Sequence, residues 1–193
     1  MNKTVLQQRL DHFDPTINFN RGSNSAIFII WYLTKYIFFL SFIPWPSALK
    51  ATLLRWFGAS VGHDIVIKPR VNIHFPWRFS LGNHSWIGEG VEIYNFAPVT
   101  VGSHVCLSQQ VFLCSGDHDF RDLSFSYRNK PISIGDGVWL QARVFVCPGV
   151  SIGRESVVTA CSLVKDDLPG NNICSGTPAI PLSFRWKGQC SMT

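Results

Sequence analysis

The sequence predicts an all-β fold, a parallel β-helix of six-residue repeats that follows an apolar helical arm and precedes a short C-terminal tail. Beyond residue 60 an aliphatic residue recurs every six positions, a period that neither a 3.6-residue helix nor an alternating strand produces. Before it, residues 26–43 are almost entirely apolar. The 193 residues suffice for one main domain. We expect the arm over residues 1–60, the β-helix over 61–170 and the tail over 171–193.

The arm contains the stretch AIFIIWYLTKYIFFLSFI, residues 26–43, which is apolar around every face of a helix and carries Lys35 as its one charge. At about 1.5 Å per residue this helix extends roughly 27 Å, close to the roughly 30 Å of a bilayer core. We expect it to dip into the membrane interface. Two alternatives stay open, a helix buried against the main domain or a sister subunit and a single membrane span. Arg21, Lys50 and Arg55 flank the arm, as suits the negatively charged cytoplasmic surface of a membrane.

A second helix is predicted after the Pro-Trp-Pro sequence at 44–46, with Ser47 as its candidate N-cap and a glycine at 58 as its end. Three apolar residues share one face of this helix: Leu49, Leu53 and Phe57. We expect the small elements at the ends of the repeat to act as caps.

The β-helix is predicted from five sets of three aliphatic residues, each set forming one triangular coil. A glycine often follows the aliphatic residue, as a tight corner requires, and the fourth position after it is usually small or β-branched. The aliphatic side chains point into the prism and stack from coil to coil. The sets are Val61, Ile67 and Ile73; Leu81, Ile87 and Ile93; Val101, Leu107 and Leu113; Ile134, Leu140 and Val146; and Ile152, Val158 and Val164.

Between Leu113 and Ile134 the six-residue phase is lost, and we expect a loop insertion over residues 114–133. The segment is polar and rich in turn-forming residues. A long loop inside a compact repeat usually has a function. Its sequence SGDHDFRD places one histidine, His118, between two aspartates, which makes it the first candidate for a reactive group.

Charge and cysteine content narrow the choice of partners. The net charge is +5 and the sequence pI about 9.0, but the basic residues are scattered and no nucleic-acid motif is present. An anionic lipid or a phosphorylated cofactor fits this charge better than nucleic acid does. The six cysteines form no CxxC pair, and no secretory cleavage pattern is present, so a reduced cytoplasmic interior without disulfides or structural zinc is expected.

Five motifs of the sequence are specific when taken together: RGSN at 21–24, LRWFGASVG at 54–62, LCSGDHDF at 113–120, IGDGVWLQARVFVCPGVSIG at 134–153 and SGTPA at 175–179. With them, residues 58–180 resemble the hexapeptide-repeat acyltransferases, the group that holds the maltose, galactoside and nodulation-factor acetyltransferases. Most of the chain is similar to the colanic acid biosynthesis acetyltransferases. The resemblance implies a left-handed coil, an exception to the usual right-handed crossover, and a homotrimer with active sites between subunits. It also implies acetyl-CoA as co-substrate and no metal.

The resemblance implies that His118 is the catalytic base. A sugar hydroxyl is almost fully protonated at neutral pH, so its attack on a thioester needs a group that removes the proton as the bond forms. The resemblance also points to the backbone N–H of Ala142 as donor to the oxyanion. Asp119, or else Asp117, is expected to orient the histidine ring. Trp139 is expected to line the acceptor pocket, as is Asp117, with packing in the trimer as the alternative for the tryptophan.

The resemblance places coenzyme A in the groove between neighbouring prisms of the trimer. Ala142, Ala160 and the turn of Gly176, Thr177 and Pro178 match the positions that touch it. Lys165 matches a phosphate contact less well, because the lysine stands one place earlier than in the family pattern. Arg185 and Lys187 are the alternative source of positive charge, and a solvated basic tail is the competing interpretation of both.

The resemblance and the apolar arm together favour an O-acetyltransferase of exopolysaccharide or O-antigen biosynthesis. Its acceptor would be a saccharide, either free or linked to a lipid. We expect the enzyme to be cytoplasmic and peripheral to the inner face of the plasma membrane. One alternative is a zinc enzyme of the γ-carbonic anhydrase type, because His63, His84 and His104 recur on one face of successive coils. The other is a non-catalytic scaffold of a polysaccharide assembly complex.

Overall fold

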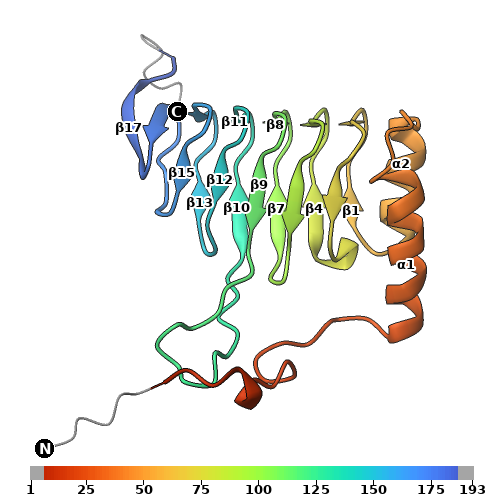
Figure 1. Cartoon of the computed structure of the whole chain (residues 1–193). Helices are drawn as coiled ribbons and strands as arrows, with labels where there is room; N and C mark the ends of the chain where they lie inside the picture. Colours follow the sequence, from red (N-terminus) through yellow and green to blue (C-terminus); the bar gives the residue numbers. More distant parts are fainter. Residues whose placement is uncertain (1–6, 187–193) are drawn as a thin grey trace, which may run out of the picture.

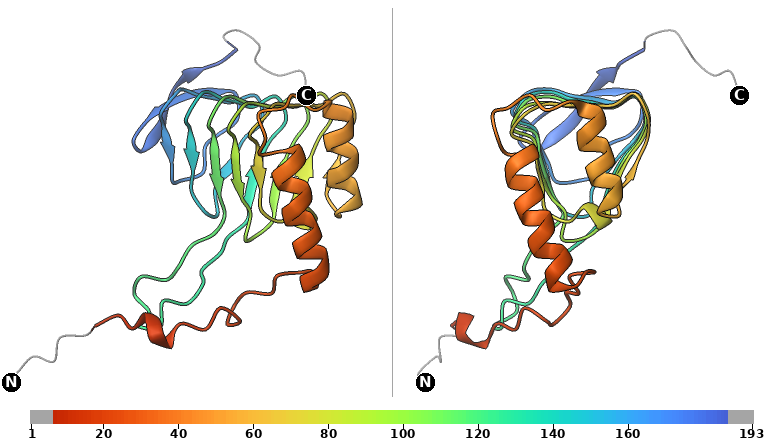
Figure 2. Two further views of the ribbon diagram at one scale, coloured as in Figure 1. Left: turned by 45° about the vertical axis from the view of Figure 1, so that its right-hand side comes forward. Right: turned by 90° about the vertical axis from the view of Figure 1, so that its right-hand side faces the viewer.

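The computed structural model describes residues 7–186, which form a three-sided prism capped by two helices at one end and by a hairpin at the other (Figure 1). Viewed along its axis from the helical end, the prism has a triangular outline (Figure 2, right). Its three walls are β-sheets in which strands from successive coils pair in parallel. We number the sheets 1 to 3 in the order in which the chain first visits them.

Each coil adds one strand to each sheet. Sheet 1 contains β1 (Ser60–Val61), β4 (Phe79–Leu81), β7 (Val99–Val101), β10 (Ile132–Ile134) and β13 (Ser151–Ile152). Sheet 2 contains β2 (Val66–Ile67), β5 (Trp86–Ile87), β8 (Cys106–Leu107), β11 (Trp139–Leu140), β14 (Val157–Val158), β16 (Asn172–Gly176) and β17 (Ala179–Phe184). Sheet 3 contains β3 (Asn72–Ile73), β6 (Glu92–Tyr94), β9 (Phe112–Cys114), β12 (Phe145–Val146) and β15 (Leu163–Val164).

The six-residue period is confirmed as the origin of the core. Every predicted inward aliphatic residue is buried except Val61, which is half-buried at the start of the first coil. Residues two positions earlier form a second buried column, mostly valine and isoleucine. The register aligns equivalent positions of successive coils, and in sheet 2 the aligned set is Ile67, Ile87, Leu107, Leu140, Val158 and Cys174.

The glycine after the aliphatic residue is required because successive coils approach closely at the corner. At Gly82 an added Cβ would lie 2.4 Å from the backbone nitrogen of Ser103, one coil further on. Real Cβ atoms do not come that near to backbone, so the corner admits no side chain there.

The first helix, α1 (Ser25–Phe38), is shorter than the predicted residues 26–43. It begins at the N-cap Asn24, whose side chain accepts from the N–H of Ile27. Beyond its end, the Trp45 indole folds back and donates to the carbonyl of Ile37 at 3.1 Å. No helix within residues 7–186 reaches the length and apolarity that crossing a membrane requires.

One stripe of α1 packs on the prism, and the opposite face is open. The inward stripe is Trp31, Lys35 and Phe39, spaced four residues apart and all buried. The Trp31 indole donates to the carbonyls of Ile73 and His74 at the end of β3. The outward face keeps large apolar side chains exposed, among them Ile29, Ile30, Leu33, Tyr36 and Ile37.

The second helix, α2 (Ser47–Trp56), closes the open end of the first coil and contacts β1 and β2. Leu53 is buried, and Leu49 and Phe57 pack against the same core. The prediction that Ser47 caps this helix is wrong, because its hydroxyl accepts the N–H of Ile67 in β2 and thereby ties the helix to the prism.

The segment predicted as an insertion forms a loop between β9 and β10 that protrudes from the corner between sheets 3 and 1 (Figure 1). Residues 7–20, which include the short 3₁₀ helix η1 (Leu10–His12), run beside it. The N–H of Arg9 donates to the carbonyl of Leu123, and the ring of Phe13 contacts those of His118 and Tyr127. A second 3₁₀ helix, η2 (Pro76–Arg78), widens the same corner two coils earlier.

The structure describes the predicted tail as far as residue 186. Strand β16 extends sheet 2 by one more parallel strand, and β17 turns back on it antiparallel. This hairpin covers the last coil, so it caps the β-helix.

Candidate active site

His118 lies near the base of the protruding loop, where two short segments pair across an antiparallel bridge between His118 and Tyr127. The Asp117 carboxylate accepts the N–H of His118 at 2.8 Å and forms an ion pair with Arg128 at 2.6 Å. The ion pair draws the Arg128 side of the loop toward Asp117. The loop therefore presents the histidine on a braced backbone rather than on a free one.

The histidine ring is held by a backbone carbonyl. Its Nδ1 lies 2.6 Å from the carbonyl oxygen of Phe125. Because a carbonyl only accepts, the ring proton must be on Nδ1, and the neutral imidazole then keeps a lone pair on Nε2. The ring also stacks on the Phe125 ring at 4.1 Å and lies 4.6 Å from the ring of Tyr127.

Asp119 does not orient the ring, contrary to the expectation from sequence. Its carboxylate accepts the N–H of Arg121 in a local turn at 3.0 Å. The orienting acceptor is the Phe125 carbonyl. Sequence reasoning missed it because a carbonyl carries no sequence signature.

A small pocket surrounds the histidine, with Tyr94, Phe96, Gly116, Asp117, Tyr127 and Asn129 as its other lining residues. The Asn129 side-chain oxygen accepts the N–H of Asp117 at 3.1 Å, which fixes the orientation of the amide. The amide nitrogen Nδ2 is buried and has no hydrogen-bond partner within residues 7–186. A buried donor without a partner is costly, so this nitrogen is available to a bound hydroxyl.

The turns predicted to contact coenzyme A come together on one edge of the prism, the corner between sheets 2 and 3. Ala142 follows β11, Ala160 follows β14, and the exposed turn of Gly176, Thr177 and Pro178 follows β16. The N–H of Ala142 has no acceptor among the described residues, as an oxyanion donor requires. The N–H of Ala160, in contrast, donates to the side chain of Gln141 at 3.1 Å.

The remaining predicted contacts lie elsewhere. Lys165 follows β15 on the corner of the loop, where it is exposed and 3.5 Å from Asp166. Arg185 is neither a solvated basic residue nor near the turns, because its guanidinium donates to the carbonyl of Gly137 and pairs with Glu155 at 3.5 Å. Lys187 is outside the described residues. Trp139 lies exposed on sheet 2, with its indole donating to Ser108, and does not line the pocket of His118 within one protomer.

The cysteines offer no competing nucleophile near the histidine. Burial raises the pKa of Cys114 and of Cys147, and nearby negative charge raises it further. A thiol with a raised pKa is less often present as the reactive thiolate. The imidazole is therefore the group at this site that is suited to take up a proton.

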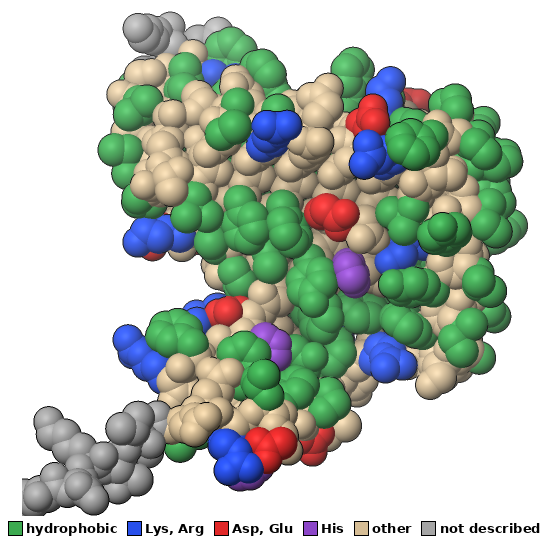
Figure 3. Space-filling view, viewed as in Figure 1, with side chains coloured by type: hydrophobic (Ala, Val, Ile, Leu, Met, Phe, Trp, Pro, Cys, Tyr) green, Lys and Arg blue, Asp and Glu red, His purple; other side chains and the backbone are tan. Residues whose placement is uncertain are grey.

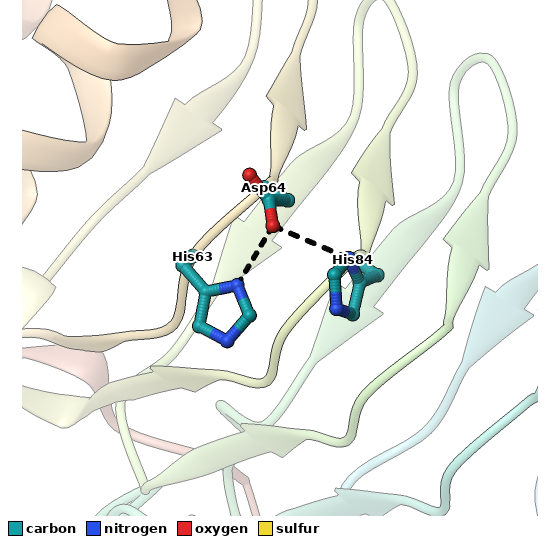
Figure 4. A group of neighbouring side chains, drawn as sticks. All are labelled: His63, Asp64 and His84. Carbon is teal, nitrogen blue, oxygen red and sulfur yellow. Dashed lines mark hydrogen bonds and ion pairs between the residues drawn. The ribbon is translucent and has the colours of Figure 1, made fainter.

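The histidines predicted to recur do form a ladder on the corner between sheets 1 and 2, and Figure 4 shows His63 and His84 beside Asp64. His63 and His84 lie with their Nδ1 atoms 2.9 Å and 3.6 Å from one carboxylate oxygen of Asp64, and the ring of His104 stacks on that of His84. The three side chains that could share a metal ion, those of His63, Asp64 and His84, are all exposed and lie on a different corner from the protruding loop. They are not part of the His118 site.

A β-helix of hexapeptide repeats, with a histidine-bearing loop on one corner and the free N–H of Ala142 on another, is the arrangement of a hexapeptide-repeat acyltransferase. No family model matches the sequence. The chain is 39% identical over 181 residues to the colanic acid biosynthesis acetyltransferase WcaF of Escherichia coli (strain K12), covering 92% of this chain and 97% of that protein. The chain belongs to this family of acetyltransferases.

Solved structures agree with this assignment. A hexapeptide-repeat acetyltransferase of Vibrio cholerae O1 biovar eltor, in complex with acetyl coenzyme A, superposes with a TM-score of 0.78 at 29% identity, covering 87% of this chain and 93% of that one. A galactoside acetyltransferase in complex with coenzyme A superposes with a TM-score of 0.74 at 25% identity, covering 83% and 81%. The predicted fold class, a left-handed β-helix of hexapeptide repeats, is confirmed.

Proposed function

We propose that this chain transfers an acetyl group from acetyl-CoA to a hydroxyl of a sugar in exopolysaccharide or O-antigen biosynthesis, with His118 as general base. The observation that carries the proposal is the 2.6 Å contact between His118 Nδ1 and the Phe125 carbonyl. It places the free lone pair on Nε2, in a pocket where the buried amide of Asn129 has an unused donor. A nitrogen that can take up a proton and a donor without a partner thus belong to residues that line the same pocket.

The reaction follows from these groups. Nε2 takes the proton of the sugar hydroxyl while its oxygen attacks the thioester carbonyl carbon. The carbonyl oxygen gains negative charge, and the Ala142 N–H stabilises it. When the carbon–sulfur bond breaks, the sulfur of coenzyme A takes the proton back from the imidazolium, leaving the ester and the free thiol. The Phe125 carbonyl stabilises the charged ring throughout.

The active site is proposed to form between subunits of a homotrimer. His118 projects from the corner between sheets 3 and 1, whereas Ala142 lies on the corner between sheets 2 and 3. Within one prism the histidine and the Ala142 N–H therefore lie on separate edges. In the proposed trimer, the histidine of one subunit faces the Ala142 N–H of its neighbour. Sedimentation equilibrium should give three chains per particle, and mixing His118→Ala with Ala142→Pro chains should restore part of the activity that each variant lacks. Ala142→Pro removes the N–H while leaving the histidine in place.

The exposed face of α1 is proposed to lie on the cytoplasmic surface of the plasma membrane, where a lipid-linked acceptor would be met. Leu33 and Ile37 are both more than half exposed on this face. Replacing both with aspartate should release the protein from washed membranes without lowering its melting temperature. A protein that is fully soluble before this change would contradict the membrane contact.

His118→Ala tests the catalytic role directly. We expect turnover of acetyl-CoA with a saccharide acceptor to fall about 10²- to 10⁴-fold, because a general base contributes that much. His104→Ala is the matched control, because it removes a histidine from the ladder on another corner. The assay is release of the free thiol of coenzyme A, with the acetylated glycan identified by mass. Unchanged turnover in His118→Ala would refute the proposal.

A further inference from the structure

A cavity lies between the N-terminal segment and the prism. Its volume is about 680 Å³, more than one sugar ring fills. Residues 15–21 and the first turns of α1 form one wall, the widened corner of the first two coils forms the second, and Tyr127 of the protruding loop forms the third. Figure 3 shows hydrophobic side chains in the hollow between loop and prism and along the helical end.

This cavity adjoins the pocket of His118. Phe96 and Tyr127 line both. The Tyr127 ring lies 4.6 Å from the imidazole on one side and 5.2 Å from the Phe19 ring on the other. Phe19 stacks on Phe96 at 4.9 Å. The ring of Tyr127 thus stands between the two spaces, so a ligand in the cavity lies next to the pocket of the histidine.

The lining favours an apolar ligand with a negative charge. Six of the lining residues are aromatic: Phe19, Phe28, Tyr32, Phe75, Phe96 and Tyr127. Arg21 is the one lining residue with a permanent charge, and its guanidinium lies 4.7 Å from the centre of the Phe28 ring. Burial lowers the pKa of His74, the other basic lining residue, to about 4, with the charge of Lys35 adding to the effect, so this imidazole is neutral. The hydroxyl and amide groups that a free oligosaccharide would need are few.

The cavity also continues toward the exposed apolar face of α1. Tyr32 lines the cavity and is itself half exposed, and Leu33 and Tyr36 follow it on the outside of the same helix. An exposed apolar surface next to an aromatic cavity is typical of a site that receives part of a lipid. A long chain bound in the cavity thus has an apolar surface beyond it.

We propose that this aromatic cavity binds the lipid-phosphate end of a lipid-linked saccharide, with Arg21 on the phosphate, the chain against the aromatic rings and the sugar directed toward His118. The inference rests on the proposed function, because it names the carrier of the acceptor sugar. The proposal makes two requirements. A lipid phosphate that carries no sugar must bind the protein, and this binding must depend on residues of the cavity rather than on the outer face of α1.

The test is calorimetric titration of the full chain with farnesyl phosphate and with farnesol. Tyr32→Ala should weaken binding of both about tenfold, because one aromatic wall is lost. Arg21→Gln should weaken the binding of farnesyl phosphate about tenfold and change the affinity for farnesol by less than about twofold. Tyr36→Ala is the matched control, since it removes the same side chain one turn further along α1, outside the cavity, and should change neither affinity by more than twofold.

Two results would overturn the inference: no binding of farnesyl phosphate to the wild-type chain, or an equal loss in Tyr36→Ala and Tyr32→Ala. The second would mean that lipid binds on the open face of α1. The His118→Ala variant separates this test from that of the catalytic role. It should bind farnesyl phosphate like the wild type whether or not it transfers acetyl groups.

Discussion

Lys50 offers a prediction whose size follows from the structure. Its side chain is fully buried on the inner face of α2, where Nζ donates to the carbonyls of Ile67 and Lys68 at 3.3 and 3.0 Å. Burial lowers the pKa of Lys50 to about 8 from its ordinary 10.5, and no carboxylate offsets the effect. The ammonium is thus held by two neutral acceptors at the end of β2.

The lowered pKa sets how stability depends on pH. Below about pH 8 the lysine is charged in both states, and the folded state carries the full cost of burying the charge, about 3 kcal/mol for a difference of about 2.5 pKa units. Between about pH 8 and 10.5 the unfolded chain binds more protons than the folded one, so this cost disappears as the pH rises. From pH 7 to 10 the contribution of Lys50 to the free energy of unfolding should increase by about 2.5 kcal/mol.

Lys50→Met tests this, because methionine keeps the apolar stem and removes the titrating group. Urea unfolding of both proteins at pH 7, 8, 9 and 10 gives the difference in free energy of unfolding at each pH. From pH 7 to 10 the free energy of unfolding of the wild type should rise by about 2.5 kcal/mol relative to that of the variant. Lys68→Met serves as the control, because Lys68 follows β2 and is exposed. Its difference in free energy of unfolding from the wild type should be the same at every pH. A constant difference for Lys50→Met as well would show that its ammonium is not desolvated.

Four further changes have expected outcomes. Ile93→Ala should lower the free energy of unfolding by about 2–5 kcal/mol in urea titrations, since the side chain is fully buried, while the exposed Ile29→Ala should cost less than about 0.5. Gly82→Ala should cost at least about 2 kcal/mol in the same assay, because its Cβ meets backbone of the next coil. Asn129→Ala should lower kcat/KM about tenfold or more in the thiol-release assay, because a donor in the pocket is lost. Asp119→Asn should stay within about threefold of wild type there; a 100-fold loss would reinstate that carboxylate as the orienting group.

The β-helix could be predicted from the sequence because its contacts are local. Each coil touches only the coils before and after it, so the same packing requirement repeats every six residues and leaves a period. The corner glycines follow from the same repetition, as Gly82 shows. Even the interruption of the period was informative, since the loop starts where the phase is lost.

Contacts between distant segments could not be predicted in this way. The bond from Arg185 to the carbonyl of Gly137 joins residues far apart in sequence, and neither residue type indicates it. The partner of His118 is a backbone carbonyl inside an irregular loop, which any residue at position 125 would provide. Lys35 shows the same limit, because a lone lysine in an apolar helix does not reveal which face turns toward the prism. In the structure Lys35 is part of the buried face.

The position of Lys35 changes the argument about the arm. If α1 lay in lipid on all sides, this lysine would face hydrocarbon, at a cost of about 3 kcal/mol. Instead it lies under the helix with its ammonium 4.4 Å from the centre of the Tyr32 ring, and the attraction of Glu92 opposes the effect of burial on its pKa. The charge thus fixes which face of α1 meets the prism, and the opposite apolar face is left exposed beside the aromatic cavity. Lys35 therefore argues against insertion of the whole helix, and it also turns the apolar face of α1 toward the side of the molecule where the aromatic cavity adjoins the pocket of His118.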